Sequence, residues 1–181
     1  MEKIESLIGT YAPDFELPGT DDGVHHLAPY LERFQTIGVV FMCNHCPYVQ
    51  MYLDRLKQIQ AEFQSPKFTL VGINPNDAEQ FPEDSFENMK TFATERQLNF
   101  PYLRDVAQDV ARAFGATKTP QAFLVDQAGK IRYGGGIDDQ PQAPSTVRSH
   151  YLRQAITQLL QGEPIAAPIT EVVGCSVKWR R

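Results

Sequence analysis

Long apolar runs, a surplus of basic residues and a dense set of cysteines are all missing from this sequence of 181 residues. No stretch approaches the roughly 18 consecutive apolar residues of a membrane helix, so we expect no membrane partner. The 17 basic and 22 acidic residues give a net charge of −5, which argues against nucleic acid as a partner. The opening MEKIESLIGTYAPDF carries acids early and lacks the apolar core of a signal peptide, so we expect a cytoplasmic protein.

Cysteine is scarce, with three residues in the whole chain. In a reducing compartment, three cysteines do not suggest a structural disulfide framework and indicate chemistry or metal binding instead. Cys43 and Cys46 lie close together in FMCNHCPYV, whereas Cys175 lies far away in GCSVKWRR. Three interpretations of the close pair are open: a redox dithiol, half of a metal site, or one peroxide-reducing thiol with a bystander.

Apolar patterning predicts alternating strands and helices. The run IGVVFM at 37–42 indicates a buried strand, and Val49, Leu53 and Leu56 fall on one face of a helix that begins at residue 44 or 45. Pro47 suits the first turn of that helix, where a missing N–H costs nothing. The other expected elements are a strand at 67–73, helices at 85–97, 105–115 and 144–162, and strands at 121–126 and 130–135.

The order of these elements indicates an α/β fold. Alternating strands and helices require a parallel core, and the closing hairpin adds antiparallel strands, so the central β-sheet is mixed and flanked by helices. The length predicts a single domain over residues 1–181. Residues 163–181 show no clear period, and we expect them to form a C-terminal tail.

The cysteine pair lies where the predicted strand ends and the helix begins. Backbone N–H groups and the positive helix end would face the Cys43 sulfur and lower its pKa, and His45 could add a charge or a hydrogen bond. Cys46 would lie one helical turn further in and be more shielded. This arrangement suits a dithiol in which Cys43 attacks and Cys46 resolves the mixed disulfide.

Metal binding is the main alternative to redox chemistry. A structural zinc site needs four ligands, and a second Cys-x-x-Cys pair is absent. Cys43, His45, Cys46 and Cys175 would complete a site only with contrived geometry. A non-catalytic thiol or metal-binding module and a pair of buried structural cysteines stay open, but Cys-x-x-Cys between a strand and a helix favours redox chemistry.

Several motifs together resemble a known superfamily. Thr119-Pro120 precedes a strand, a place where a cis proline occurs. With the Cys-x-x-Cys helix, it resembles the thioredoxin fold. The opening YAPDFELPGTDDG resembles the redoxins, which include the alkyl hydroperoxide reductase and thiol-specific antioxidant family. FMCNHCPYV, INPND…FPEDSFENMK and GCSVKW resemble the peroxiredoxin-like thioredoxin-family proteins of bacteria, over nearly the whole chain.

The resemblance implies a thioredoxin-like fold with an N-terminal redoxin extension. It implies Cys43 at the attacking position, Cys46 at the resolving position and Pro120 as the active-site cis proline that receives the substrate chain. His45 resembles a histidine that stabilises the thiolate in strongly oxidising members of the fold. The implied function is thiol–disulfide oxidoreductase, without a dissociable cofactor or metal. The implied partners are protein or small-molecule disulfides and thiols, and a cellular thiol reductant.

An antioxidant thiol peroxidase is the alternative within this superfamily. Peroxiredoxins carry a threonine or serine three residues before the reactive cysteine, but Val40 holds that position here. Their arginine on a later strand is also missing from QAFLVD. Because these groups stabilise the leaving oxygen of peroxide, a fast peroxidase is not expected. Arg104, Arg112 and Arg132 are candidate replacements, although a surface position is expected for each.

Two further segments bear on the site. Asn74, Asn76 and Asp77 follow a strand at its carboxyl end, where the cysteines also emerge, so their loop could border the site. The tail could return and place Cys175 beside the pair as a third redox thiol. Cys175 could equally be a small apolar residue packed under the tail. Both interpretations of Cys175 stay open.

Overall fold

The computed structural model describes residues 2–64 and 67–181. Its helices and strands follow in the order α1 (Glu2–Leu7), β1 (Glu16–Pro18), β2 (Val24–His26), α2 (Leu27–Arg33), β3 (Thr36–Phe41), α3 (Pro47–Phe63), β4 (Phe68–Asn74), η1 (Pro82–Asp84), α4 (Phe86–Glu95), β5 (Tyr102–Arg104), α5 (Asp109–Phe114), β6 (Lys118–Thr119), β7 (Gln121–Asp126), β8 (Ile131–Gly135), η2 (Pro144–Thr146), α6 (Tyr151–Leu160) and β9 (Cys175–Ser176).

A five-stranded sheet in the order β5-β4-β3-β7-β8 forms the centre of the molecule. Strand β3 pairs in parallel with β4, which pairs in parallel with β5, whereas β7 is antiparallel to both β3 and β8. The predicted mixed sheet is therefore confirmed, and this topology is that of a thioredoxin-like fold. The peptide bond between Thr119 and Pro120 is cis, as the sequence predicted.

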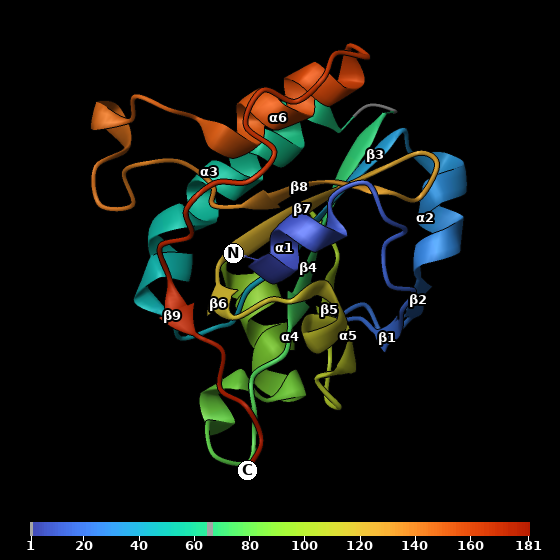
Figure 1. Ribbon diagram of the computed structural model, residues 1–181. Helices are drawn as coiled ribbons and strands as arrows, with labels where there is room; N and C mark the ends of the chain where they lie inside the picture. The colour runs from blue at the N-terminus through green and yellow to red at the C-terminus, as the bar shows by residue number, and fades with distance from the viewer. Residues whose placement is uncertain (1, 65–66) are drawn as a thin grey trace.

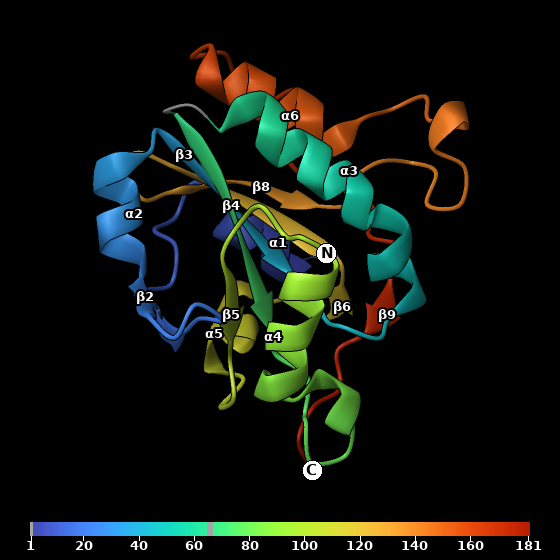
Figure 2. The same ribbon diagram turned by 180° about the vertical axis from the view of Figure 1, so that it is seen from behind.

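Helices cover both faces of the sheet (Figures 1 and 2). Helices α3 and α6 lie side by side on one face, where Leu53 and Ile156 pack with Leu70 and Leu124 of the strands. On the other face, α1, α2 and α5 pack against the alternate strand residues, among them Val39. Burial of the central strands on both faces explains their continuous apolar runs.

Helix α3 begins later than the sequence predicted. It starts at Pro47, and Cys46 is its N-cap residue with extended backbone angles of φ −65° and ψ 125°. The expected start at residue 44 or 45 is therefore wrong, as is the expected place of Cys46 inside the helix. The physical reason is that proline disfavours the helical conformation in the residue before it.

Other boundaries also differ. The final helix covers only Tyr151–Leu160 of the predicted range 144–162, because a short 3-10 turn at Pro144–Thr146 is followed by Val147 in an extended conformation. Apolar patterning does not predict β5, whose three residues are too few for a period to show. Among the described residues, no helix is long and apolar enough to cross a membrane.

Residues 163–181 return across the molecule to β6, beside the cysteines that follow the end of β3. Ile169 forms an isolated parallel bridge with Gly134 of β8, and β9 pairs with β6 in antiparallel register, Lys118 with Ser176 and Thr119 with Cys175. Both views show β9 beside β6 (Figures 1 and 2). The tail therefore contacts the segment directly before Pro120.

Candidate active site

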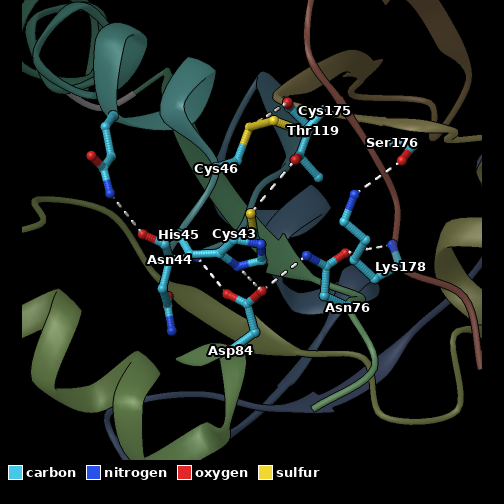
Figure 3. Close-up of a disulfide and its surroundings, with 11 residues drawn as sticks. Cys43, Asn44, His45, Cys46, Asn76, Asp84, Thr119, Cys175, Ser176 and Lys178 are labelled. Atoms are coloured by element: carbon cyan, nitrogen blue, oxygen red, sulfur yellow. Dashed lines mark hydrogen bonds and ion pairs between the residues drawn. A yellow bond between two sulfur atoms is a disulfide. The ribbon is translucent and has the colours of Figure 1, made fainter. Parts of the chain in front are cut away.

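The site lies in the loop between β3 and α3, beside β6 and the tail (Figure 3). Cys43 follows the end of β3 by two residues and has no exposed surface. Its Sγ lies 3.6 Å from the hydroxyl oxygen of Thr119. The Sγ of Cys46 lies 3.4 Å from the carbonyl oxygen of the same threonine. Thr119, which directly precedes Pro120, therefore touches both sulfur atoms of the Cys-x-x-Cys pair.

The bond between sulfur atoms joins Cys46 to Cys175, and Cys43 is free. The two bonded residues are 129 positions apart in sequence, and their Cα atoms lie 6.2 Å apart, within the range usual for a disulfide. The structure thus brings all three cysteines together and gives the tail cysteine a covalent partner. Sequence reasoning left the place of Cys175 open between Cys43 and Cys46.

The thiol of Cys43 is not activated in this state. Burial raises its pKa to about 11, and the nearby carboxylate of Asp84 adds to the rise. The Thr119 hydroxyl and the backbone N–H groups of Cys46 and His45 act in the opposite direction but do not outweigh burial. The expectation of a lowered pKa is therefore wrong for the form in which Cys46 is bonded to Cys175.

Asp84 is the residue at the site that sequence reasoning missed. Its carboxylate is fully buried and contacts Nδ1 of His45 at 2.5 Å. It also accepts hydrogen bonds from the backbone N–H of Asn44 at 2.7 Å and from the side-chain amide of Asn76 at 3.0 Å. The ring of His45 stacks on Phe81, the residue directly before the 3-10 turn η1 that contains Asp84. The segment FPEDS therefore holds the histidine between the two cysteines.

The loop after β4 borders the site, as the sequence suggested. The side-chain oxygen of Asn76 accepts a hydrogen bond from the backbone N–H of Lys178, at 2.9 Å. The backbone N–H of Asp77 donates to the Lys178 carbonyl, at 2.8 Å. Because the amide of Asn76 also donates to Asp84, one side chain joins the C-terminal tail to the buried carboxylate beside Cys43.

The three arginines considered as peroxide ligands have other contacts. Arg104 is buried rather than on the surface, and its guanidinium donates to the carbonyl groups of Asn74 and Asn76. Burial lowers its pKa. Arg112 lies over the Trp179 ring, and Arg132 pairs with Asp126.

One group of side chains offers the geometry for a metal ion. Cys43, His45 and Asp84 each present a ligand atom, and these atoms all lie within 4.8 Å of one another. A structural zinc site needs a fourth ligand, and Cys46 is bonded to Cys175 in this state. The carboxylate of Asp84 is also already occupied by its hydrogen bonds. The arrangement is therefore better matched to proton and sulfur chemistry.

A thioredoxin-like sheet with a Cys-x-x-Cys pair before a helix defines the class as thiol-based redox proteins. Comparison with known proteins agrees. The chain belongs to the AhpC/TSA family, whose model matches residues 8–134. The protein is accordingly a redox enzyme, related to thiol–disulfide and peroxiredoxin-like proteins.

Relatives with different descriptions share this fold and sequence pattern. A solved structure from Geobacillus kaustophilus, described as an uncharacterized conserved protein, is 37% identical with a TM-score of 0.89, covering 96% of this chain and 92% of that one. The thiol-disulfide oxidoreductase ResA of Geobacillus thermodenitrificans is 24% identical over 72% of this chain and 70% of its own. A Mycobacterium tuberculosis protein named as a candidate peroxiredoxin is 30% identical over 68% of this chain and 80% of its own.

The negative charge of Asp84 near Cys43 gives a testable prediction. Replacing Asp84 by Asn removes the negative charge beside the thiol, so the pKa of Cys43 falls from about 11 and its alkylation below that pH speeds up. A fall of one pKa unit raises the thiolate fraction below the pKa, and with it the alkylation rate, about tenfold. The measurement is the rate of iodoacetamide alkylation of the oxidised protein against pH, with modified Cys43 identified by mass spectrometry.

Asp77→Asn is the matched control for Asp84→Asn. It removes the same charge from the same loop, but Asp77 is not among the groups that shift the pKa of Cys43. The pH at which the alkylation rate of Cys43 is half-maximal should therefore be the same in this control as in the wild type. If this half-maximal pH is unchanged or higher in Asp84→Asn, the carboxylate does not raise the pKa of Cys43.

Proposed function

We propose that the protein is a thiol–disulfide oxidoreductase in which three cysteines, Cys43, Cys46 and Cys175, pass one disulfide among them. The observation that carries this proposal is the free thiol of Cys43 beside a bonded Cys46–Cys175 pair. A simple dithiol enzyme would hold its oxidising equivalents between Cys43 and Cys46. Here the disulfide joins Cys46 to Cys175 instead, so the attacking residue Cys43 is again a free thiol.

The proposed sequence begins with the three thiols reduced. The Cys43 thiolate attacks a substrate disulfide, forms a mixed disulfide and releases one substrate thiolate. The Cys46 thiolate then attacks the Cys43 sulfur, which forms Cys43–Cys46 and releases the second substrate thiolate. Cys175 attacks the Cys46 sulfur, which gives the Cys46–Cys175 bond and frees Cys43. The substrate gains two electrons, and two protons from the enzyme thiols accompany them.

His45 and Pro120 complete the proposed site. His45 is the proposed stabiliser of the Cys43 thiolate, because a ring nitrogen lies within 4.8 Å of the sulfur and the contact with Asp84 fixes the ring. Pro120 follows Thr119, whose carbonyl and hydroxyl contact the two sulfur atoms, so the backbone here is the proposed support for the substrate chain. None of these steps requires a dissociable cofactor.

The reductant and location are part of the same proposal. The Cys46–Cys175 bond returns to two thiols when a cellular thiol reductant supplies two electrons and two protons. Protein or small-molecule disulfides are the proposed substrates. A cytoplasmic location and a single functional unit over residues 1–181, with 163–181 as its tail, are proposed from the sequence.

A thiol peroxidase is the second candidate. The family match and the Thr119 hydroxyl, 3.6 Å from the Cys43 sulfur, favour it. In that reaction, Cys43 would take one peroxide oxygen to become a sulfenic acid and release water or an alcohol, and Cys46 would then form a disulfide and release water. Arg104 is bonded to backbone carbonyls, so no charge-assisted donor from this residue supports the step.

Single-turnover reduction of a small chromogenic disulfide by the prereduced chain tests the first proposal. Cys43→Ser should slow the release of chromogenic thiol at least about 100-fold, because a hydroxyl replaces the attacking thiolate. Cys46→Ser should leave the attack intact and trap a mixed disulfide on Cys43. Full activity in Cys43→Ser, with the mixed disulfide found on Cys46, would show that Cys46 and not Cys43 is the attacking cysteine.

Hydrogen peroxide consumption by the prereduced protein separates the two candidates. We expect peroxide consumption to be slower than disulfide reduction by about 100-fold or more. The reason is that Arg104, the buried candidate for polarising peroxide, donates its hydrogen bonds to backbone carbonyls instead. Cys43→Ser sets the background rate. Peroxide consumption that outpaces disulfide reduction and depends on Cys43 would make the protein a peroxidase first.

A further inference from the structure

The chain's own tail occupies the sheet edge that lies beside both cysteines of the Cys-x-x-Cys pair. Strand β9 pairs with β6 so that Cys175 lies opposite Thr119 and Ser176 opposite Lys118. Thr119 is also the residue whose hydroxyl and carbonyl contact the sulfurs of Cys43 and Cys46. An extended segment here thus presents a cysteine directly to Cys46, and Figure 3 shows this geometry.

The position before that cysteine accepts only glycine. A Cβ added at Gly174 would overlap the carbonyl oxygen of Thr119 and lie 2.8 Å from its carbonyl carbon. Both atoms belong to the backbone, so they cannot rotate away as a flexible side chain would. Residues on either side are less constrained, since Val173 is 37% exposed and Ser176 is exposed. The edge therefore selects a segment with Gly-Cys at its centre.

Contacts on the C-terminal side of Cys175 hold the segment independently of the disulfide. The backbone N–H of Val177 donates to the Thr117 carbonyl at 2.9 Å. The carbonyl of Lys178 accepts from the side-chain amide of Gln108 at 2.9 Å, and the Gln108 oxygen accepts from the backbone N–H of Arg180. These are backbone contacts of the bound segment, and another polypeptide could reproduce them.

On the N-terminal side, the tail is held by side-chain contacts of its own. The Thr170 hydroxyl lies 2.6 Å from the Tyr133 hydroxyl and accepts a hydrogen bond from the Gly136 N–H at 3.0 Å. These contacts do not involve the disulfide, so they tether the tail near the edge without it. A tethered segment has a high effective concentration at its own site, so it competes strongly with any segment from solution.

We propose that the edge of β6 is a binding site for an extended polypeptide with Gly-Cys at its centre, and that the tail is a tethered occupant that excludes such a substrate while Cys46 is bonded to Cys175. This rests on the proposed oxidoreductase function for its substrate, but not for the binding site itself. Reduction of the bond, with two electrons and two protons from two thiols that become a disulfide, leaves the tail held by noncovalent contacts alone, and a substrate segment can displace these.

Binding of a synthetic peptide tests the site without any redox step. The probe is a fluorescent peptide with the sequence of residues 171–179 in which the position of Cys175 is serine. It is titrated into oxidised wild type, reduced wild type and reduced Gly174→Ala. The tail of the variant cannot approach Thr119, so the peptide should bind it at least about tenfold more tightly than it binds oxidised wild type.

Two controls keep the result specific. A second peptide with alanine in place of its glycine should bind reduced Gly174→Ala at least about tenfold more weakly, because its Cβ meets the same carbonyl. Gly23→Ala is the matched variant, since a Cβ there meets only the exposed side chain of Asp21, 3.3 Å away. It should bind the peptide as wild type does in each redox state. If Gly174→Ala does not fold, the reduced double variant Thr170→Ala/Cys175→Ser takes its place, because it lacks both the hydroxyl that anchors the tail to Tyr133 and the cysteine.

Equal binding of the glycine and alanine peptides, or equal binding to oxidised wild type and to reduced Gly174→Ala, would overturn the proposal. Reduction rates with insulin and with oxidised glutathione then separate the binding site from the oxidoreductase function. The ratio of the insulin reduction rate to the glutathione reduction rate should be at least about fivefold higher for Gly174→Ala than for wild type. Specific peptide binding without reduction of either disulfide would refute the oxidoreductase function and leave the site standing.

Discussion

The bond between Cys46 and Cys175 is the interaction on which the rest of the site depends. It joins residues 129 positions apart and ties Cys175 of β9 covalently to the cysteine loop, beside the pairing of β9 with β6. Through that pairing, Lys178 reaches Asn76, and Asn76 reaches Asp84 beside Cys43. A change in the bonding of the tail is therefore connected by direct contacts to the carboxylate that raises the pKa of the free thiol.

The buried carboxylate of Asp84 is stable at this position because it has several partners. An unpaired charge in a protein interior is costly, whereas a paired and hydrogen-bonded one is tolerated. Asn44, Asn74 and Asn76 donate to its two oxygens, and His45 contacts one of them. These donors come from the cysteine loop, from the last residue of β4 and from the loop that follows it. Asp84 thereby joins the two loops and fixes the histidine between the cysteines.

Much of the fold could be predicted from local patterns. The apolar runs of β3 and β4, the amphipathic face of α3, the hairpin of β7 and β8 and the cis bond before Pro120 all have signals within a few residues. The start of α3 was misplaced because the Cys-x-x-Cys motif outweighed the effect of Pro47 on the residue before it. Strand β5 was missed because three residues show no period.

The site was harder to predict because its parts are far apart in the chain. Cys43, His45, Cys46 and Pro120 carry local motifs, but the partner of Cys175 depends on the path of a tail whose strand β9 is only two residues long. Asp84 lies in an ordinary turn sequence, and only its burial beside His45 distinguishes it. The expected lowering of the Cys43 pKa rested on backbone N–H groups and the positive helix end, whereas burial of the thiol in the folded chain outweighs them.

The central claim is that the tail cysteine, not Cys43, is the partner of Cys46 in the oxidised protein. Mass-spectrometric mapping of disulfides tests it directly, after oxidation in glutathione buffers of graded potential and blocking of free thiols. The account predicts a link between the peptides that carry Cys46 and Cys175, with the blocking group on Cys43. A link between Cys43 and Cys46 at every potential, with Cys175 blocked, would contradict it.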